Sequence, residues 1–264
     1  MRVEPTPDVW ANGDAYERFV GRWSRLVATE FLRWLEPAPQ QNWLDVGCGT
    51  GVLARAIAVD AEPRRVVGID PSHAFLACAR ASSDPRVCFD VGDARALPYG
   101  AERFDLVVSG LMLNFVPGPA QALSEMRRVV RPGGLVAAYV WDYADEMQLL
   151  HCFWDAAADL DRVASELDEG RRFPLCGPEP LERLFANAGL TGVAVHAIEV
   201  PTRFVDFEDY WTPFLGGQGP GPTYVASLDS RAREALRERL RVRLPTASDG
   251  SINLMARAWA VRGS

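Results

Sequence analysis

The residues that by type and spacing most clearly suit ligand binding lie in one stretch, NWLDVGCGTG, over residues 42–51. A short apolar run ends at the carboxylate Asp45 and passes into a turn that contains Gly47, Gly49 and Gly51. Glycines let a nucleoside approach the main chain, and the free amides at the start of a following helix can bind it. Asp45 would repel a pyrophosphate but would suit an ammonium or sulfonium group. The stretch therefore predicts a site for a nucleoside ligand that carries positive charge.

Two further carboxylates follow apolar runs. RVVGID, residues 65–70, ends in Asp70, and a run over 87–91 leads to Gly92, Asp93 and Ala94. Because the carboxyl ends of adjacent parallel strands meet at one edge of a sheet, we expect Asp70 to face the glycine turn. There it could accept two hydrogen bonds from a ribose diol.

The elements that must position these side chains alternate along the chain. Strands are expected at residues 43–44, 65–70, 87–91, 106–109, 135–141, 192–200 and 252–262. Helices are expected at 52–59, 72–81 with Ser72 as the N-cap, 120–130, 147–167, 178–188 and 230–244. Nearly continuous apolar strands in such an alternation predict an α/β fold, a doubly wound and Rossmann-like parallel sheet covered on both faces.

A single domain over residues 1–264 is expected from the length and from the 48% hydrophobic content. Residues 1–39 would form a helical cap, with two helical pieces meeting near Gly21. Residues 40–141 would form the ligand-binding core, and 142–177 and 201–250 would form insertions that make a lid. The cap either packs on the sheet edge or folds over the glycine turn and brings Tyr16, Arg22, Trp23 and Ser24 to the ligand.

The composition of the chain restricts the kinds of partner that the protein is expected to bind. The formal net charge of −7 argues against general binding of nucleic acid or of an anionic membrane. Five cysteines without a C-x-x-C pair, together with three histidines, suggest no metal site. No basic-then-apolar leader and no long apolar run is visible, so a soluble, cytoplasmic monomer or homodimer is expected.

The chain resembles the class I S-adenosylmethionine-dependent methyltransferases over about residues 40–140. LDVGCGTG, VGID, VGDARALP, FDLVVS and the RPGG turn resemble the motifs of this family in their usual order. Among its members, the chain looks most like the small-molecule and quinone-type enzymes. The resemblance implies a seven-stranded, mostly parallel sheet with an antiparallel last strand. It also implies S-adenosylmethionine as cofactor and S-adenosylhomocysteine as product.

The resemblance also implies roles for individual residues. Gly47 and its neighbours would hold the methionine end of the cofactor, Asp45 would favour its ammonium, and Asp70 would bind the ribose. The adenine contacts would be Asp93 to the exocyclic amine, the Ala94 amide to a ring nitrogen, and Pro71 and Leu97 on the two ring faces. The Ser109 carbonyl would lie near the methionine amine, and the candidates for the methionine carboxylate are Tyr16, Arg22 and Ser24.

Methyl transfer requires positioning of the acceptor and, for a protonated nucleophile, a general base. His151 is the candidate base, with a plain packing role as its alternative. Aromatic residues of the insertions suggest a flat, apolar acceptor, methylated at O, N or C, although such residues can simply pack a lid. The candidates for substrate contact are Trp141, Tyr143, Trp211 and Phe214.

Two other functions stay open at this point, an RNA or protein methyltransferase and a non-catalytic scaffold that binds the cofactor. The acidic balance of the chain disfavours the first. The intact glycine turn and Asp70 disfavour the second.

Overall fold

The computed structural model describes residues 21–81, 84–216 and 219–264. Its centre is a seven-stranded sheet of order β3-β2-β1-β4-β5-β7-β6. The strands are β1 Asn42–Val46, β2 Arg65–Asp70, β3 Val87–Val91, β4 Phe104–Gly110, β5 Val130–Trp141, β6 Ala194–Phe204 and β7 Ile252–Gly263. The pairs among β1 to β5 are parallel, whereas β7 is antiparallel to both of its neighbours. The predicted fold class, including the antiparallel last strand, is confirmed.

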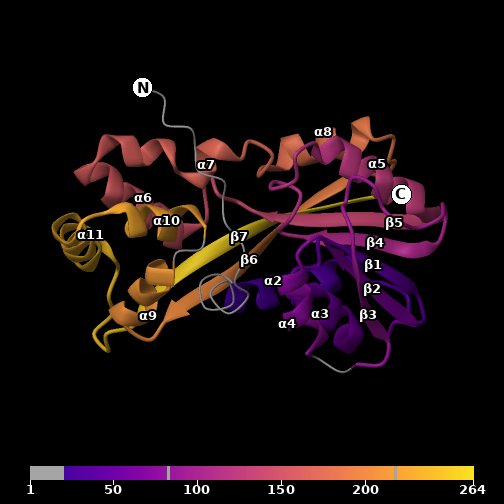
Figure 1. The fold of residues 1–264 in the computed structure, drawn as a ribbon, viewed down its shortest axis with the longest axis horizontal. Coiled ribbons are helices and arrows are strands. Elements are labelled where there is room, and N and C mark those ends of the chain that lie inside the picture. Colours follow the sequence, from indigo (N-terminus) through magenta and orange to yellow (C-terminus); the bar gives the residue numbers. More distant parts are fainter. Residues whose placement is uncertain (1–20, 82–83, 217–218) are drawn as a thin grey trace.

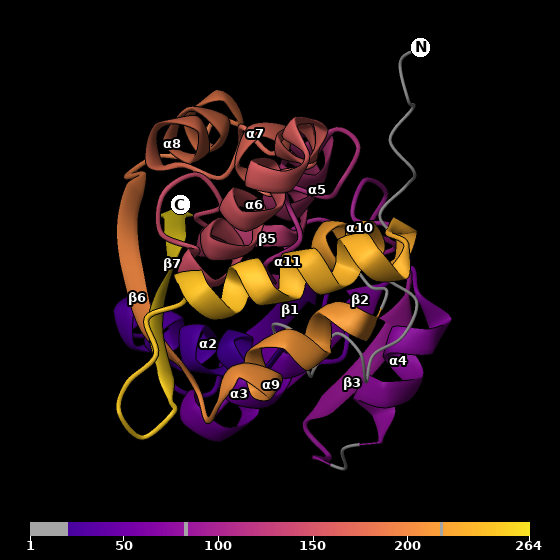
Figure 2. The ribbon, with the colours of Figure 1, turned by 90° about the vertical axis from the view of Figure 1, so that its left-hand side faces the viewer.

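Helices cover both faces of this sheet (Figures 1 and 2). On one face lie α2 Arg22–Leu35, α3 Val52–Asp60 and α4 His73–Arg80. On the other lie α5 Pro119–Val129 and α8 Pro178–Asn187. The predicted cap of α4 is confirmed, because the Ser72 side chain accepts a hydrogen bond of 3.3 Å from the Phe75 amide.

The helix α2 shows how an apolar stripe fixes the packing. Trp23, Val27, Phe31 and Leu35 recur at intervals of four residues and are all buried. The Phe31 ring packs on Tyr139 of β5, with 4.8 Å between the ring centroids. This helix therefore covers the sheet next to the ends of the central strands.

A helical lid lies at the end of the molecule on the left of Figure 1. Its helices are α6 Gln148–Leu160, α7 Glu169–Arg172, α9 Phe207–Trp211, α10 Pro220–Ser227 and α11 Ser230–Arg243, with 3-10 segments at Arg162–Glu166 and Thr212–Gly216. The helix predicted over 147–167 is shorter than expected, because Asp161 is extended and caps the first 3-10 segment.

Residues 205–251 leave the sheet and return to it at neighbouring points. The last residue of β6 pairs with the first residue of β7, Phe204 with Ile252. The segment therefore connects two strand ends that are paired with each other.

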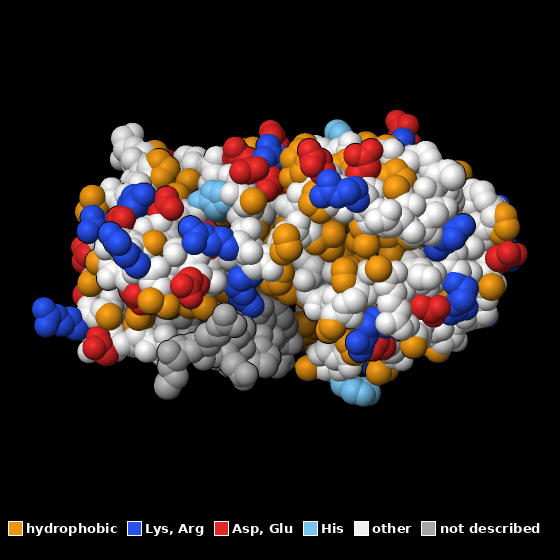
Figure 3. Space-filling view, turned by 90° about the horizontal axis from the view of Figure 1, so that it is seen from above, with side chains coloured by type: hydrophobic (Ala, Val, Ile, Leu, Met, Phe, Trp, Pro, Cys, Tyr) orange, Lys and Arg blue, Asp and Glu red, His pale blue; other side chains and the backbone are white. Residues whose placement is uncertain are grey.

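Charged side chains of both signs are spread over the face shown in Figure 3, and hydrophobic side chains gather in a hollow near its middle. Among the helices of the described ranges, none combines the length and the hydropathy needed to cross a bilayer.

Candidate active site

The glycine turn after β1 is tied to the neighbouring strand. The amides of Gly47 and Cys48 donate to the Ile69 carbonyl at 2.8 and 3.1 Å. Gly47, Gly49 and Gly51 have φ values of +70°, +52° and +83°, which favour glycine. A Cβ on Gly47 would also lie 2.3 Å from Cγ of Met112, so the absence of a side chain lets two loops meet closely.

Asp70 lies against this turn, as the position of the strand ends predicts. One carboxylate oxygen accepts from the Gly49 amide at 3.0 Å, and the other accepts from the Ser72 amide at 2.8 Å. Burial raises the pKa of Asp70 above its usual value, and the two amides oppose that shift. The side chain is held in place while further lone pairs stay available to a ligand.

Asp45 has a different environment. Its side chain is buried, and neither carboxylate oxygen has a hydrogen-bond partner among the described residues. Burial raises its pKa to about 7, and the negative charge of Asp70 raises it further. The Ala54 amide at the start of α3 points toward the carboxylate and lowers the pKa, although it does not form a well-aligned hydrogen bond. A buried carboxylate without a partner is costly, so this position favours a cationic or hydrogen-bond-donating ligand.

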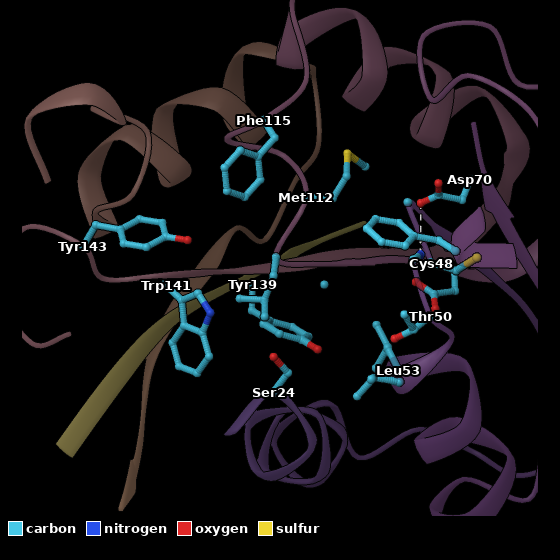
Figure 4. Close-up of a pocket in the computed structure, with 17 residues that line it drawn as sticks. Ser24, Cys48, Thr50, Leu53, Asp70, Met112, Phe115, Tyr139, Trp141 and Tyr143 are labelled. Carbon is cyan, nitrogen blue, oxygen red and sulfur yellow. Dashed lines mark hydrogen bonds between the residues drawn. The ribbon is translucent and has the colours of Figure 1, made fainter. Parts of the chain in front are cut away.

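Asp45 and Asp70 line a pocket with about 920 Å³ of unfilled space, including the open solvent at its mouth. One end is formed by the glycine turn with Thr50, Leu53 and Phe75. The other end is aromatic, and Figure 4 shows it to the left of the turn. Its aromatic members are Phe115, Tyr139, Trp141 and Tyr143. None of the described lining residues is basic.

The loop after β4 separates these two ends. Leu111 adopts the unusual φ of 59°, and its amide donates to the Tyr139 carbonyl at 2.8 Å. Met112 and Phe115 follow and line the pocket. A Cβ on Gly110 would lie 2.6 Å from the Tyr139 hydroxyl, so that ring packs directly over the end of β4.

The structure brings only some of the predicted site residues to this pocket. Those that line it are Ser24, Asp45, Gly47, Gly49, Asp70, Trp141 and Tyr143. Those that do not line it are Arg22, Gly51, Pro71, Asp93, Ala94, Leu97, Ser109, His151, Trp211 and Phe214. Tyr16 lies outside the described residues.

Asp93 and Arg22 are engaged elsewhere. Asp93 forms an ion pair of 2.6 Å with Arg95, whose hydrogen bonds lower the pKa of the Asp93 carboxyl. Arg22 forms an ion pair of 2.8 Å with Asp209 of α9 and stacks over the Phe204 ring. Arg95 lies two positions from Asp93, whereas Asp209 is separated from Arg22 by 187 positions and could not be identified from local sequence.

The candidates from the insertions also differ from expectation. His151 donates its Nε2 hydrogen to the Tyr143 carbonyl at 2.9 Å, so it supports a pocket residue without lining the pocket. Trp211 and Phe214 are buried inside the lid, where Phe214 stacks on Phe153 with 4.3 Å between centroids. Trp211 and Phe214 therefore pack the lid, which is the role given above as the alternative to substrate contact.

The lining residues that were not predicted are Cys48, Thr50, Val52, Leu53, Phe75, Gly110, Leu111, Met112, Phe115 and Tyr139. Tyr139 could have been found, because it precedes Trp141 by two positions in one strand and so shares its face. Met112 and Phe115 lie in a loop whose path gives no periodic signal.

Comparison with known proteins agrees with this geometry. Residues 44–138 match the family model described as a methyltransferase domain. The chain is 30% identical over 230 residues to trans-aconitate 2-methyltransferase of Streptomyces avermitilis, with 82% of each protein covered. It is 41% identical over 107 residues to 2-phytyl-1,4-naphtoquinone methyltransferase of Thermosynechococcus vestitus, which is 39% of this chain and 48% of that protein. For this and several other curated relatives, the chain spans only 33–48% of the relative's length.

Solved structures share the fold. Phosphoethanolamine N-methyltransferase 2 of Haemonchus contortus, solved with S-adenosylhomocysteine, matches with a TM-score of 0.58 and 19% identity, over 95% of this chain and 56% of that one. The long match to the Streptomyces enzyme and the family model agree with the strand order and the glycine turn. The chain therefore belongs to the class I S-adenosylmethionine-dependent methyltransferases.

Proposed function

We propose that this protein transfers a methyl group from S-adenosylmethionine to O, N or C of a small, aromatic or apolar acceptor. One observation carries the proposal. A single pocket joins an unpartnered, buried carboxylate at the glycine turn to an aromatic end that lacks basic residues among the described lining.

The residues at the turn fit the cofactor. Asp45 offers a buried acceptor for the methionine ammonium, and Asp70, fixed by the Gly49 and Ser72 amides, offers one for the ribose hydroxyls. Gly49 lines the pocket, and a Cβ there would meet nothing within 4 Å, so a ligand can approach the main chain at this residue. When bound, the cofactor supplies an electrophilic methyl group on a positively charged sulfur.

The aromatic end would act by positioning. Phe115 and Tyr143 both pack on Phe173, which follows α7, with centroid separations of 5.0 and 5.7 Å. A Cβ on Gly170 would lie 2.7 Å from the Tyr143 carbonyl, so the lid is in close contact with this wall. Rigid aromatic walls can hold a flat acceptor against the transferable group and exclude water. Such positioning contributes up to about 7–11 kcal/mol in model reactions.

Calorimetric titration of the purified protein with S-adenosylmethionine, S-adenosylhomocysteine and NAD tests the cofactor. We expect micromolar binding of the two sulfur nucleosides and none of NAD. Release of S-adenosylhomocysteine in the presence of small aromatic acceptors then tests transfer. Binding of NAD alone, or no turnover with any small acceptor alongside turnover on RNA or protein, would contradict the proposal.

A further inference from the structure

Among the described residues that line the pocket, two polar side chains of different kinds are buried and have no hydrogen-bond partner. One is the Asp45 carboxylate and the other is the indole N–H of Trp141, whose side chain is 2% exposed. The first accepts and the second donates. The cofactor accounts for Asp45, whereas Trp141 lies at the other end of the pocket and needs a different partner.

The sheet register shows how these groups are arranged. Asp45 pairs with Val108 of β4, and Gly110, two residues further along that strand, pairs with Tyr139 of β5. Alternate residues share a face, so Asp45, Tyr139 and Trp141 all lie on the face covered by α2. Figure 4 shows Tyr139 between the glycine turn and Trp141, with the nitrogen-bearing edge of the indole turned toward the middle of the labelled group. Trp141 is therefore on the acceptor side of Tyr139.

A buried N–H without a partner is unfavourable, because it loses its hydrogen bonds to water and makes none in the protein. Three indole N–H groups of the described residues are in this state, those of Trp23, Trp43 and Trp141, and of these residues Trp141 lines the pocket. The described residues around Trp141 supply no acceptor for it. An oxygen atom on a bound molecule would satisfy it without any movement of the strand.

The charge of the lining restricts what that molecule is. The two ionisable carboxyl groups of the pocket belong to Asp45 and Asp70, and no arginine or histidine lines it among the described residues. An acceptor with several carboxylates would bring like charges together, and the described lining supplies no cationic side chain to compensate them. A neutral oxygen meets no such penalty.

We propose that the Trp141 indole N–H donates a hydrogen bond to a neutral oxygen of a planar, uncharged acceptor whose ring packs beside Phe115 and Tyr143. Trp141 is thus a specificity-determining residue, and the acceptor class is an oxygenated aromatic molecule such as an aryl ketone, ether or phenol. This inference rests on the proposed function, and it separates this chain from enzymes that bind polycarboxylates.

The test uses the full-length protein saturated with S-adenosylhomocysteine and two ligands of nearly the same shape. These are 1-tetralone, an aryl ketone, and tetralin, the hydrocarbon that lacks its oxygen. Binding is measured by calorimetry for the wild type, for Trp141→Phe and for Trp43→Phe. Trp43 is the matched control, because its indole N–H is also buried and unpartnered but does not line this pocket.

We expect the wild type and Trp43→Phe to bind the ketone about three- to tenfold more tightly than the hydrocarbon, the range typical of one hydrogen bond. Trp141→Phe should bind both with similar affinity. Retention of the preference by Trp141→Phe, or its loss in Trp43→Phe, would overturn the assignment. So would binding of trans-aconitate as tight as that of 1-tetralone.

Binding of S-adenosylhomocysteine checks each variant for an intact site. If Trp141→Phe does not bind S-adenosylhomocysteine, the test rests on the wild-type affinities for 1-tetralone and tetralin. Equal affinity of the wild type for both, or binding of neither, overturns the inference. A wild-type protein that binds neither sulfur nucleoside overturns the proposed function. One that binds S-adenosylhomocysteine but shows no preference for the ketone overturns only the inference.

Discussion

The two halves of the molecule each bury a carboxylate, and they treat it differently. In the half built on the glycine turn, Asp45 has no hydrogen-bond partner among the described residues. In the lid, Glu169 at the start of α7 accepts a short hydrogen bond from the Trp154 indole N–H. Burial raises the pKa of each carboxyl to about 7.

This difference indicates that the half built on the glycine turn binds a ligand, whereas the lid has a structural role. In the lid, the Tyr210 hydroxyl donates to the Leu149 carbonyl at 2.7 Å, and the aromatic rings pack on one another. The cofactor half leaves acceptors unpaired around an open pocket. At the glycine turn the unsatisfied Asp45 carboxylate lines the pocket, whereas the aromatic rings of the lid mainly pack on one another.

The largest expected effect comes from Gly47→Ala in the cofactor half. The positive φ costs about 1–2 kcal/mol for a residue with a Cβ, and crowding against Met112 adds about 1–3 kcal/mol. The free energy of unfolding, measured by urea denaturation, should fall by about 2–5 kcal/mol. Gly49→Ala is the control, because φ is also positive there but a Cβ meets nothing within 4 Å. Equal losses for the two variants would show that crowding contributes nothing.

Asp70→Ala should weaken the binding of S-adenosylmethionine. Loss of the carboxylate removes the acceptor for the ribose and frees the Gly49 amide, and we expect S-adenosylmethionine to bind about 10- to 100-fold more weakly by calorimetry. Asp90→Ala removes an exposed carboxylate on the adjacent strand β3 and should leave the affinity unchanged. An unchanged dissociation constant for Asp70→Ala would refute the ribose assignment.

Asp45 should make cofactor affinity depend on pH. With a folded-state pKa of about 7, the side chain holds a proton below that value, and an ammonium ligand favours the ionised form. Affinity should therefore rise with pH by up to about tenfold per unit toward pH 7 and level off above it. Asp45→Asn should flatten this profile. The same pH profile in both proteins would assign the titration to another group.

The smallest effect is expected in the lid, for Glu169→Gln. The folded-state pKa of Glu169 lies above its unfolded value, so the wild type loses stability as pH rises from about 4.5 to 7. Glutamine keeps an acceptor for Trp154 and carries no charge. At pH 8 the variant should be more stable by about 1 kcal/mol in thermal or urea unfolding, and cofactor affinity should not change. A variant that is less stable than the wild type at pH 8 would mean that the charge is useful to the lid.

Much of the fold could be predicted, because apolar runs, glycines and caps act over a few residues. The strand from Arg65 to Asp70 and the cap at Ser72 were predicted at the positions where they occur. Asp70 could also be placed against the turn, since parallel strands end at a common edge.

The pocket lining was less predictable where it depends on partners distant in sequence. Arg22 is separated by 187 positions from Asp209, the residue that holds it, and His151 reaches a carbonyl in a loop before its own helix. The aromatic residues of the insertions gave no local sign of whether they face the ligand or one another. Trp141 and Tyr143 line the pocket, whereas Trp211 and Phe214 fill the lid.

The pairing of Phe204 with Ile252 has a consequence for how such proteins diversify. Because residues 205–251 leave and re-enter the sheet at adjacent positions, connections of different length could join β6 to β7 and keep the pairing of these two strands. Insertions, deletions or exchange of that whole segment would leave the glycine turn and its carboxylates in place. The segment could thus be exchanged in a lineage as one module while the pocket stays inherited, since none of its described residues lines the pocket.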